Sequence, residues 1–342
     1  MTKPASPDLA ARLAAFLAHA AGAPVTITCM RPIAGGASRE TWAVDAVIGG
    51  AQTALVLRMD LASSMNPDAL SRPQEFALLA AAHAAGVLAP RPRWLDANGA
   101  ALGRPFLLMD RVAGESIGPR VVRRPELAAA RARLPAQMAT QLARIHALDP
   151  TALDFLPQPS AGQPPALHAL DHTRRVLDAI SLQNPALEFG LRWLVQRAPR
   201  CAQPTLLHGD FRIGNLLVGP AGLGAVIDWE FAHVGDPHED LAWPCVRDWR
   251  FGNDALHVGG VGELAPYLAA YTTASGRTVD RNALRWWEIM GNLRWATTCH
   301  IQAHRHLSGA DPSVELASLG RRAAEMELEF LTLIEQEEPG YS

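Results

Sequence analysis

The chain has 342 residues, enough to bury a substantial core as one large domain or as two lobes. Hydrophobic residues make up 49% of it and charged residues 19%, which are both globular values. The net charge of −3 implies no general affinity for nucleic acid.

No segment has the pattern of a membrane span or a secretion signal. Residues 9–21 are rich in Ala and Leu, but Arg12 and His19 make an amphipathic helix the better interpretation. The four cysteines are far apart and form no C-x-x-C pair, so neither a zinc site nor a disulfide framework is indicated. We expect a cytoplasmic protein that binds neither nucleic acid nor membrane. The oligomeric state stays open, with a homodimer as one option.

The first third of the chain predicts one helix followed by several short strands. Gly22 and Pro24 end the helix, and Gly49-Gly50 forms a turn between two of the strands. The helix is expected over residues 8–21 and the first three strands over 25–33, 41–47 and 54–59.

A glycine-rich tip lies between the first two predicted strands. Glycine lets backbone approach a ligand closely, so amides around Gly35, Gly36 and Ser38 could cover phosphate groups. An ordinary hairpin accounts for the tip equally well. The sequence contains no GxxxxGK[ST] motif, which excludes a P-loop nucleotide site.

This region also contains two charged residues of interest, Arg58 and Glu75, and one more predicted strand. Arg58 ends the third strand, and Glu75 lies in the first turn of a helix predicted over residues 73–85. Acidic residues are also favoured in a first turn by the helix dipole alone. Residues 105–112 predict a buried strand that meets a loop.

The stretch 206–228 predicts a strand, a polar loop and a hairpin that ends in an acid. Asp210 and Asn215 lie in the loop, and Asp228 follows the second hairpin strand, so all three are expected at the same open end. Phosphoryl transfer needs a carboxylate that accepts the proton of a hydroxyl, together with an amide and a second carboxylate that hold Mg²⁺. The alternative is a polar turn between two buried strands.

The segment His208-Gly209-Asp210, followed by Asn215 and by Ile227-Asp228-Trp229-Glu230, resembles the HGD-x-x-x-x-N … IDWE pattern of the aminoglycoside phosphotransferase/choline kinase family. The resemblance extends over roughly residues 25–305 and includes the GDP-x-x-D-L segment that contains Asp240. Val56-Leu57-Arg58 and the segment from IDWE to GDP look closer to the branch fused to acyl-CoA dehydrogenases than to antibiotic-resistance enzymes.

The resemblance implies an α+β fold of the two-lobed, protein-kinase-like type. Residues 1–112 would form a small N-lobe with an antiparallel sheet, and residues 113–342 a larger, mostly helical C-lobe. ATP, with GTP as the alternative donor, would bind between the lobes with Mg²⁺. The acceptor would be a hydroxyl group of a small molecule.

The family's site residues carry over to matching positions of this chain. Arg58 departs from the usual lysine, and a guanidinium grips phosphate in a different geometry from an ammonium. The implied roles are a catalytic base at Asp210, Mg²⁺ ligands at Asn215 and Asp228, loop-organising residues at His208 and Asp240, phosphate-side residues at Arg58, Glu75, Gly35, Gly36 and Ser38, and a purine-binding hinge at Met109, Asp110 and Val112.

The remainder of the chain reads as helices. Asp236, Pro237 and Glu239 have the form of a helix start, so Asp236 is interpreted as an N-cap. Five tryptophans from Trp243 to Trp295 are interpreted as packing residues, with a site for a quaternary amine as the alternative. Helices are expected over residues 126–148, 166–181, 185–197, 264–273, 282–303 and 313–333.

The substrate is not written in the sequence. Asp248, Asp254, Glu263 and Glu288 form no dense acidic cluster of the kind an aminoglycoside or a choline-type amine would need. Arginines of the same region could meet an anionic substrate, such as a hydroxyacyl thioester of coenzyme A. Two other function classes stay open: a catalytically weak nucleotide-binding regulatory protein, and an interaction protein that binds no nucleotide.

Overall fold

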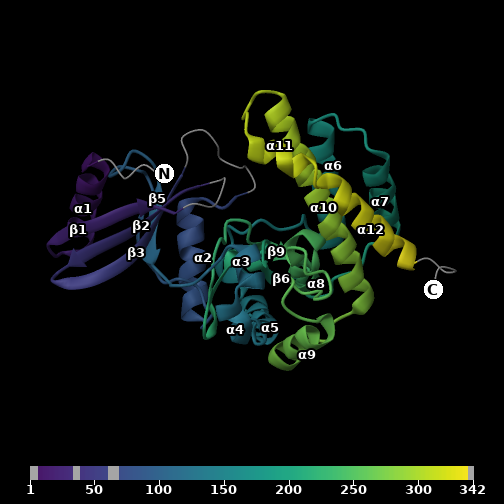
Figure 1. Cartoon of the computed structure of the whole chain (residues 1–342), viewed down its shortest axis with the longest axis horizontal. Helices are drawn as coiled ribbons and strands as arrows, with labels where there is room; N and C mark the ends of the chain where they lie inside the picture. The colour runs from purple at the N-terminus through teal and green to yellow at the C-terminus, as the bar shows by residue number, and fades with distance from the viewer. Residues whose placement is uncertain (1–6, 34–38, 61–68, 338–342) are drawn as a thin grey trace.

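A five-stranded antiparallel sheet forms one side of the molecule, and helices make up most of the other side (Figure 1). The computed structural model describes residues 7–33, 39–60 and 69–337. The predicted two-lobed α+β fold is confirmed by this arrangement. None of the helices within the described ranges is both long and apolar enough to cross a membrane.

The sheet has the strand order β1-β2-β3-β5-β4. Gly49 and Gly50 both have positive φ angles, of 56° and 86°, and they close the β2–β3 turn, which explains the glycine pair in the sequence. The three predicted strands are confirmed, and the second and third are longer than expected. The strands are β1 (Val25–Pro32), β2 (Arg39–Ile48), β3 (Ala51–Asp60), β4 (Pro92–Asp96) and β5 (Phe106–Asp110).

Strand alternation decides which way the residues of β3 face. Leu55, Leu57 and Met59 pack in a core with helix α1 (Pro7–Ala21). Val56 and Arg58 therefore point to the opposite face. Helix α2 (Arg72–Ala84) covers this second face, so Arg58 lies opposite the helix that carries Glu75.

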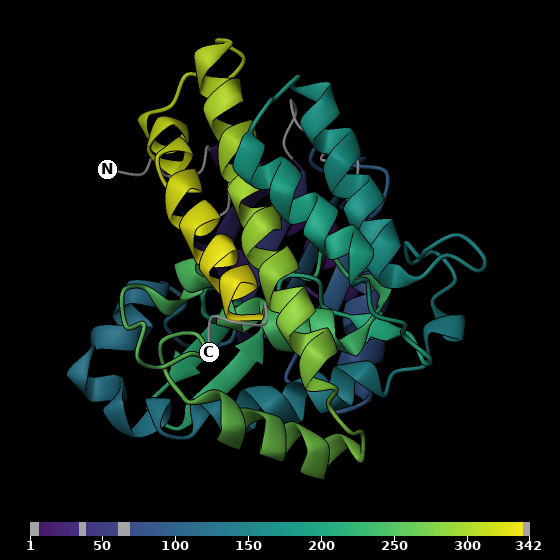
Figure 2. The same ribbon diagram turned by 90° about the vertical axis from the view of Figure 1, so that its right-hand side faces the viewer.

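In the larger region the helices α10 (Arg281–Leu307) and α12 (Ala323–Glu337) pack against each other, and Figure 2 shows them side by side. The other helices and 3₁₀ turns are α3 (Gly118–Arg123), η1 (Pro125–Leu127), α4 (Ala128–Arg131), α5 (Leu134–His146), η2 (Pro150–Ala152), α6 (Pro165–Ala179), α7 (Pro185–Gln196), α9 (Leu264–Ser275) and α11 (Val314–Gly320).

Two helices that were predicted as continuous are broken, and those predictions are wrong. The segment 126–148 divides into η1, α4 and α5, because Pro135 lacks an N–H donor and starts a new helix. The segment 313–333 divides into α11 and α12. A Cβ on Gly320, the last residue of α11, would lie 2.6 Å from the Ala303 side chain, so a glycine allows this close approach to α10.

The central stretch forms two small antiparallel pairs. The predicted hairpin consists of β7 (Leu216–Gly219) and β8 (Gly222–Val226), and only Pro220 and Ala221 separate the strands. Strand β6 (Thr205–Leu207) pairs with β9 (His233–Gly235). The short helices that follow are η3 (Ile213–Asn215), α8 (Pro237–Ala242), η4 (Trp243–Cys245) and η5 (Arg247–Arg250).

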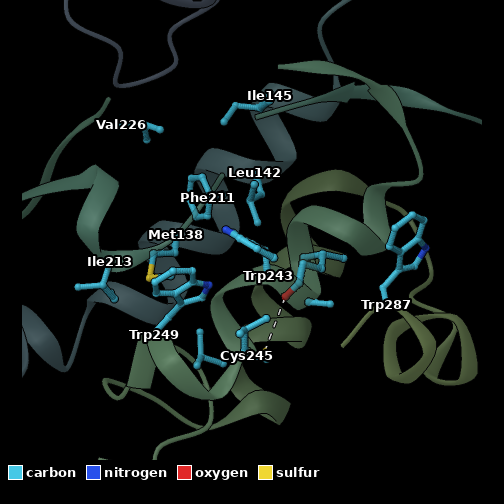
Figure 3. Close-up of a cluster of buried hydrophobic side chains, with 14 of the residues drawn as sticks. Met138, Leu142, Ile145, Phe211, Ile213, Val226, Trp243, Cys245, Trp249 and Trp287 are labelled. Atoms are coloured by element: carbon cyan, nitrogen blue, oxygen red, sulfur yellow. Dashed lines mark hydrogen bonds between the residues drawn. The ribbon is translucent and has the colours of Figure 1, made fainter. Parts of the chain in front are cut away.

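A buried apolar cluster anchors the loop between β6 and β7 (Figure 3). Phe211 and Ile213 of this loop are fully buried and belong to the same core as Met138, Leu142 and Ile145 of α5. Trp286 and Trp287 are each only 2% exposed, which confirms their interpretation as packing residues.

We expect Leu142→Ala to lower the free energy of unfolding by about 2–5 kcal/mol, because it leaves a cavity beneath the β6–β7 loop. Leu307→Ala is the matched control, since Leu307 is 81% exposed. Urea unfolding monitored by tryptophan fluorescence measures both variants. Equal stabilities would contradict the assignment of Leu142 to the core.

Candidate active site

Asp210 and Asn215 are joined by hydrogen bonds across the β6–β7 loop. The Asn215 side-chain amide donates to Asp210 Oδ2 at 2.6 Å and to the Asp210 carbonyl oxygen at 2.9 Å. The 3₁₀ turn η3 brings Asn215 back towards Asp210. The amide nitrogen of Asn215 is thus engaged, and its Oδ1 is the atom left to face a cation.

Asp228 lies next to Asn215 because the backbone N–H of Ile227 donates to the Asn215 carbonyl oxygen at 2.9 Å. Asp228 has a φ of 68°, in the left-handed region that Asp tolerates better than most residues. Burial opposes ionisation of Asp228, but the Arg58 guanidinium outweighs it and lowers the pKa of this carboxyl. Asp228 is therefore a carboxylate at neutral pH.

Arg58 connects this end of the hairpin to the sheet and to α2. Its two terminal nitrogens contact Glu75 at 2.9 Å and Asp228 at 2.7 Å, and Glu230 lies 3.7 Å away. Burial disfavours the charge of Arg58, but Glu75, Asp228 and Glu230 together raise its pKa above the ordinary value. The predicted pair of Arg58 and Glu75 thus forms, and Asp228 extends it.

Arg72 is a member of this network that the sequence analysis missed. It is 1% exposed, it contacts Glu75 on the same helix, and its Nε lies 3.1 Å from Asp60 of β3. The spacing of three residues between Arg72 and Glu75 in a first turn is a sequence signal for their pair, but the contact with Asp60 and the burial are visible only in the structure. Glu75 therefore lies between two arginines.

His208 and Asp240 hold the backbone of the loop. Asp240 accepts hydrogen bonds from the backbone N–H groups of His208 at 2.7 Å and Gly209 at 3.0 Å. Burial lowers the pKa of His208, whose Nδ1 accepts from the Asp210 N–H while Nε2 donates to the Ile227 carbonyl oxygen. This neutral ring ties Asp210 to the residue before Asp228. Asp236 caps α8, as predicted.

Two more side chains contact Asp210. Arg212 was considered only as one of the arginines that could meet an anionic substrate, and neither contact was predicted. The Trp243 indole N–H donates to Asp210 Oδ1 at 2.7 Å, and Arg212 Nε donates to the same oxygen at 3.1 Å. Trp243 follows Asp240 by three residues at the end of α8, and the sequence analysis interpreted it as a packing residue, with a quaternary-amine site as the alternative. The indole nitrogen, the only polar atom of the Trp243 side chain, therefore contacts the candidate base.

The proposed hinge lies at the end of β5. Met109 shares a small pocket with Arg58, Glu75 and Asp228, so it borders the ionic network. Asp110 is the last residue of β5, and Val112 lies two residues after it. Gly35, Gly36 and Ser38 lie outside the described residues.

The donor set of Asn215 and Asp228 fits Mg²⁺, which prefers amide and carboxylate oxygens. One oxygen of Asp228 contacts Arg58, and its side chain stays 28% exposed, so the second oxygen is accessible. Within the described ranges, no group of three or more His, Cys, Asp or Glu side chains could hold a metal alone. Mg²⁺ at this place would depend on phosphate oxygens and water for its other ligands.

Comparison with known proteins decides the family. The model of the phosphotransferase enzyme family matches residues 30–287. The chain belongs to this family. The prediction of a phosphotransferase with a protein-kinase-like fold agrees with this assignment.

Individual relatives agree with the family assignment. Mouse acyl-CoA dehydrogenase family member 10 is 32% identical over 200 residues, which cover 56% of this chain but only 18% of that protein. The predicted likeness to the branch fused to acyl-CoA dehydrogenases is thereby confirmed.

Solved structures support the fold. A Ralstonia eutropha protein assigned as an aminoglycoside phosphotransferase superposes with a TM-score of 0.73 at 21% identity, covering 94% of this chain and 97% of that one. Aminoglycoside phosphotransferase APH(4)-Ia, in its ternary complex with AMP-PNP and hygromycin B, has a TM-score of 0.58 at 16% identity, covering 92% and 97%.

We expect Asp240→Asn to cost about 2–3 kcal/mol at neutral pH, because an amide has one acceptor oxygen for the donors that now face both carboxylate oxygens, which are His146 and the backbone of His208 and Gly209. Burial by itself would raise the pKa of Asp240. The hydrogen bond from His146 and the other donors outweigh burial, so the net pKa lies below the ordinary value. Its stabilisation is therefore present above the unfolded-state pKa and is lost as the pH falls. Urea unfolding from neutral pH down to about pH 2.5, well below the ordinary carboxyl pKa of roughly 3.9, should show a flatter pH dependence for the variant than for the wild type. A parallel dependence would contradict the role of this carboxylate.

Proposed function

We propose that the chain is a kinase that transfers the γ-phosphoryl group of ATP to a hydroxyl group of a small molecule. The observation that carries this proposal is the single network in which Asp210, Asn215, Asp228 and Arg58 meet. These residues come from the β6–β7 loop, the end of the hairpin and β3, and only the fold brings them together.

Asp210 is the proposed base. Its side chain is 14% exposed, and Asn215, Trp243 and Arg212 hold both of its oxygens in place. A carboxylate held in this way accepts the proton of a bound hydroxyl as the oxygen attacks phosphorus. The surrounding donors fix the orientation of the Asp210 carboxylate; they do not make it a stronger base.

The phosphate side of the proposed site consists of Arg58, fixed by Glu75, and the backbone around Gly35, Gly36 and Ser38. Asn215 and Asp228 would hold Mg²⁺, which neutralises phosphate charge when it is bound. The backbone of Asp110 and Val112, beside Met109, would bind the purine. This assignment places the boundary between an N-lobe of residues 1–112 and a C-lobe of residues 113–342 directly after the hinge. ATP is the proposed donor, with GTP as the alternative.

An aminoglycoside or choline-type substrate is less well supported, because two of the acids near the last helices are already paired. Asp248 contacts Arg322 and accepts from the Trp295 indole at 2.6 Å. Glu288 is 3% exposed and contacts Arg250 and His257. A regulatory role without catalysis depended on the replacement of lysine by Arg58, and the Arg58–Glu75 pair weakens that argument.

We expect Asp210→Asn to lower turnover by roughly 10²–10⁴-fold, because the base is lost while the shape is kept. ADP release from Mg-ATP, measured with a panel of small hydroxyl compounds, reports turnover. Nucleotide affinity should not change. Asp236→Asn is the matched control, since Asp236 caps α8 and does not contact Asp210. Near-normal turnover of Asp210→Asn would exclude Asp210 as the base.

We expect Mg-ATP to raise the melting temperature of the wild type, and Asp228→Ala to abolish the Mg²⁺-dependent part of this rise. Ligand at about 100 times its dissociation constant stabilises by roughly 2.7 kcal/mol, which a thermal-shift assay resolves. The assay compares ATP with and without Mg²⁺, and also GTP. Asp171→Ala is the control, since Asp171 is exposed on α6. No shift of the wild type at millimolar nucleotide would favour a protein that binds no nucleotide.

A further inference from the structure

Arg212 lies between the proposed base and a proposed metal ligand. It follows Asp210 by two residues and precedes Asn215 by three, and its carbonyl oxygen accepts from the Asn215 N–H at 2.8 Å. Its side chain folds back over the loop, where Nε donates to Asp210 Oδ1 at 3.1 Å.

The guanidinium extends from Asp210 towards the other end of the loop. A Cβ on Gly214 would lie 2.1 Å from Arg212 Nη1 and 3.2 Å from its Cζ, so the absence of a side chain at Gly214 leaves this place to the arginine. Nη1 therefore lies against the residue that directly precedes Asn215. One cation spans the distance from the base to the metal-binding side.

The plane of the guanidinium rests on an aromatic ring. Its central carbon lies 4.4 Å from the centroid of Trp249, which is 4% exposed and packs on Trp243 and Trp295. An arginine stacked in this way loses little side-chain entropy when it binds an oxyanion. The site is thus preorganised before any ligand arrives.

Arg212 also retains unused donors. The Arg212 side chain is 26% exposed, and among the described residues only its Nε makes a hydrogen bond. Arg58 is engaged by Glu75 and Asp228, and Arg294 contacts Glu239 at 2.6 Å while it stacks on Trp243. Of these three arginines beside the site, Arg212 is the one with both terminal nitrogens available.

We propose that Arg212 is a further catalytic residue, whose terminal nitrogens bind the oxygens of the phosphoryl group while it moves from donor to acceptor. This inference depends on the proposed function. In the step, the acceptor O–H bond breaks and its proton goes to Asp210, while the acceptor oxygen bonds to the γ-phosphorus. The bond from this phosphorus to the bridging oxygen breaks, and the electron pair leaves with the nucleoside diphosphate. The moving group lies between Asp210 and the metal side, which is the span that Arg212 covers.

The test compares Arg212→Ala and Arg212→Gln with the wild type. The probe is Mg-ATP with water as acceptor, and single-turnover ADP release gives the rate of transfer. The dissociation constant of Mg-AMP-PNP, measured by calorimetry, gives ground-state binding. Arg197→Ala is the matched control, because Arg197, the residue that follows α7, stacks on Trp193 of that helix with its central carbon 4.6 Å from the ring centroid, outside the site.

We expect both Arg212 variants to transfer roughly 10²–10³-fold more slowly, because a charged donor to the transition state is lost. Binding of Mg-AMP-PNP should stay within about threefold of the wild type, since the effect is confined to the transition state. The control should match the wild type in both measurements.

Three outcomes would overturn the inference. A rate for Arg212→Ala within about threefold of the wild type would show no catalytic role. Recovery of the rate in Arg212→Gln, whose amide can still donate to Asp210, would show that Arg212 only positions the base. A loss of Mg-AMP-PNP affinity as large as the loss of rate would show that Arg212 acts in ground-state binding. A wild type that binds no Mg-AMP-PNP would instead refute the proposed function, so the two failures are distinguishable.

Discussion

Arg58 is a charged side chain that is almost completely buried, and the structure around the candidate site depends on the need to neutralise this charge. A buried guanidinium is tolerated only where carboxylates surround it. Glu75 comes from α2, and Asp228 and Glu230 come from the segment after the hairpin. Because the partners belong to different parts of the chain, their ion pairs hold the sheet, α2 and the end of the hairpin together. Removing Arg58 would take their shared buried cation away from these carboxylates, which is far more costly than losing a surface ion pair.

The loop that carries Asp210 is held by a different means. Its backbone N–H groups donate to Asp240, its histidine ring is neutral and bridges to Ile227, and its apolar side chains are buried in the core beneath it. Polar groups above and apolar packing below leave the loop little freedom. Asp210 and Asn215 are therefore presented on a rigid support, which is the condition that precise positioning of a base requires.

Tryptophans connect this loop to the helical region. Trp243 donates to Asp210, Trp249 lies beneath Arg212, and Trp295 packs on Trp249 while it donates to Asp248. Arg322 contacts Asp248 from the turn between α11 and α12. A chain of ring contacts and hydrogen bonds thus runs from the candidate base to the last helices. These rings pack as core residues do, and two of them also orient charged groups at the site.

Much of the site could be predicted from residue order alone. The spacing of His208, Asp210, Asn215 and Asp228 requires only a loop and a hairpin, which are local structures set by turn residues and apolar alternation. Alternation along β3 likewise determined that Arg58 and Leu57 face opposite ways. The family and the fold class were implied by the resemblance of these motifs to a known family, and the outlines of most helices followed from apolar spacing.

Tertiary structure decided the rest, because it depends on residues that are distant in the sequence. Pairing of Arg58 with Asp228 joins positions 170 residues apart, and no local pattern contains that distance. Trp243 and Arg72 were missed since an indole N–H or a buried guanidinium acquires a role only when a distant carboxylate arrives beside it. The helix break near Pro135 reflects the missing backbone N–H of proline, and Gly320 at the other break lies in close contact with α10. Apolar periodicity contains neither kind of information. The sequence by itself therefore determined which chemistry the loop and hairpin can carry, and the packing of separate elements decided which charges and rings surround it.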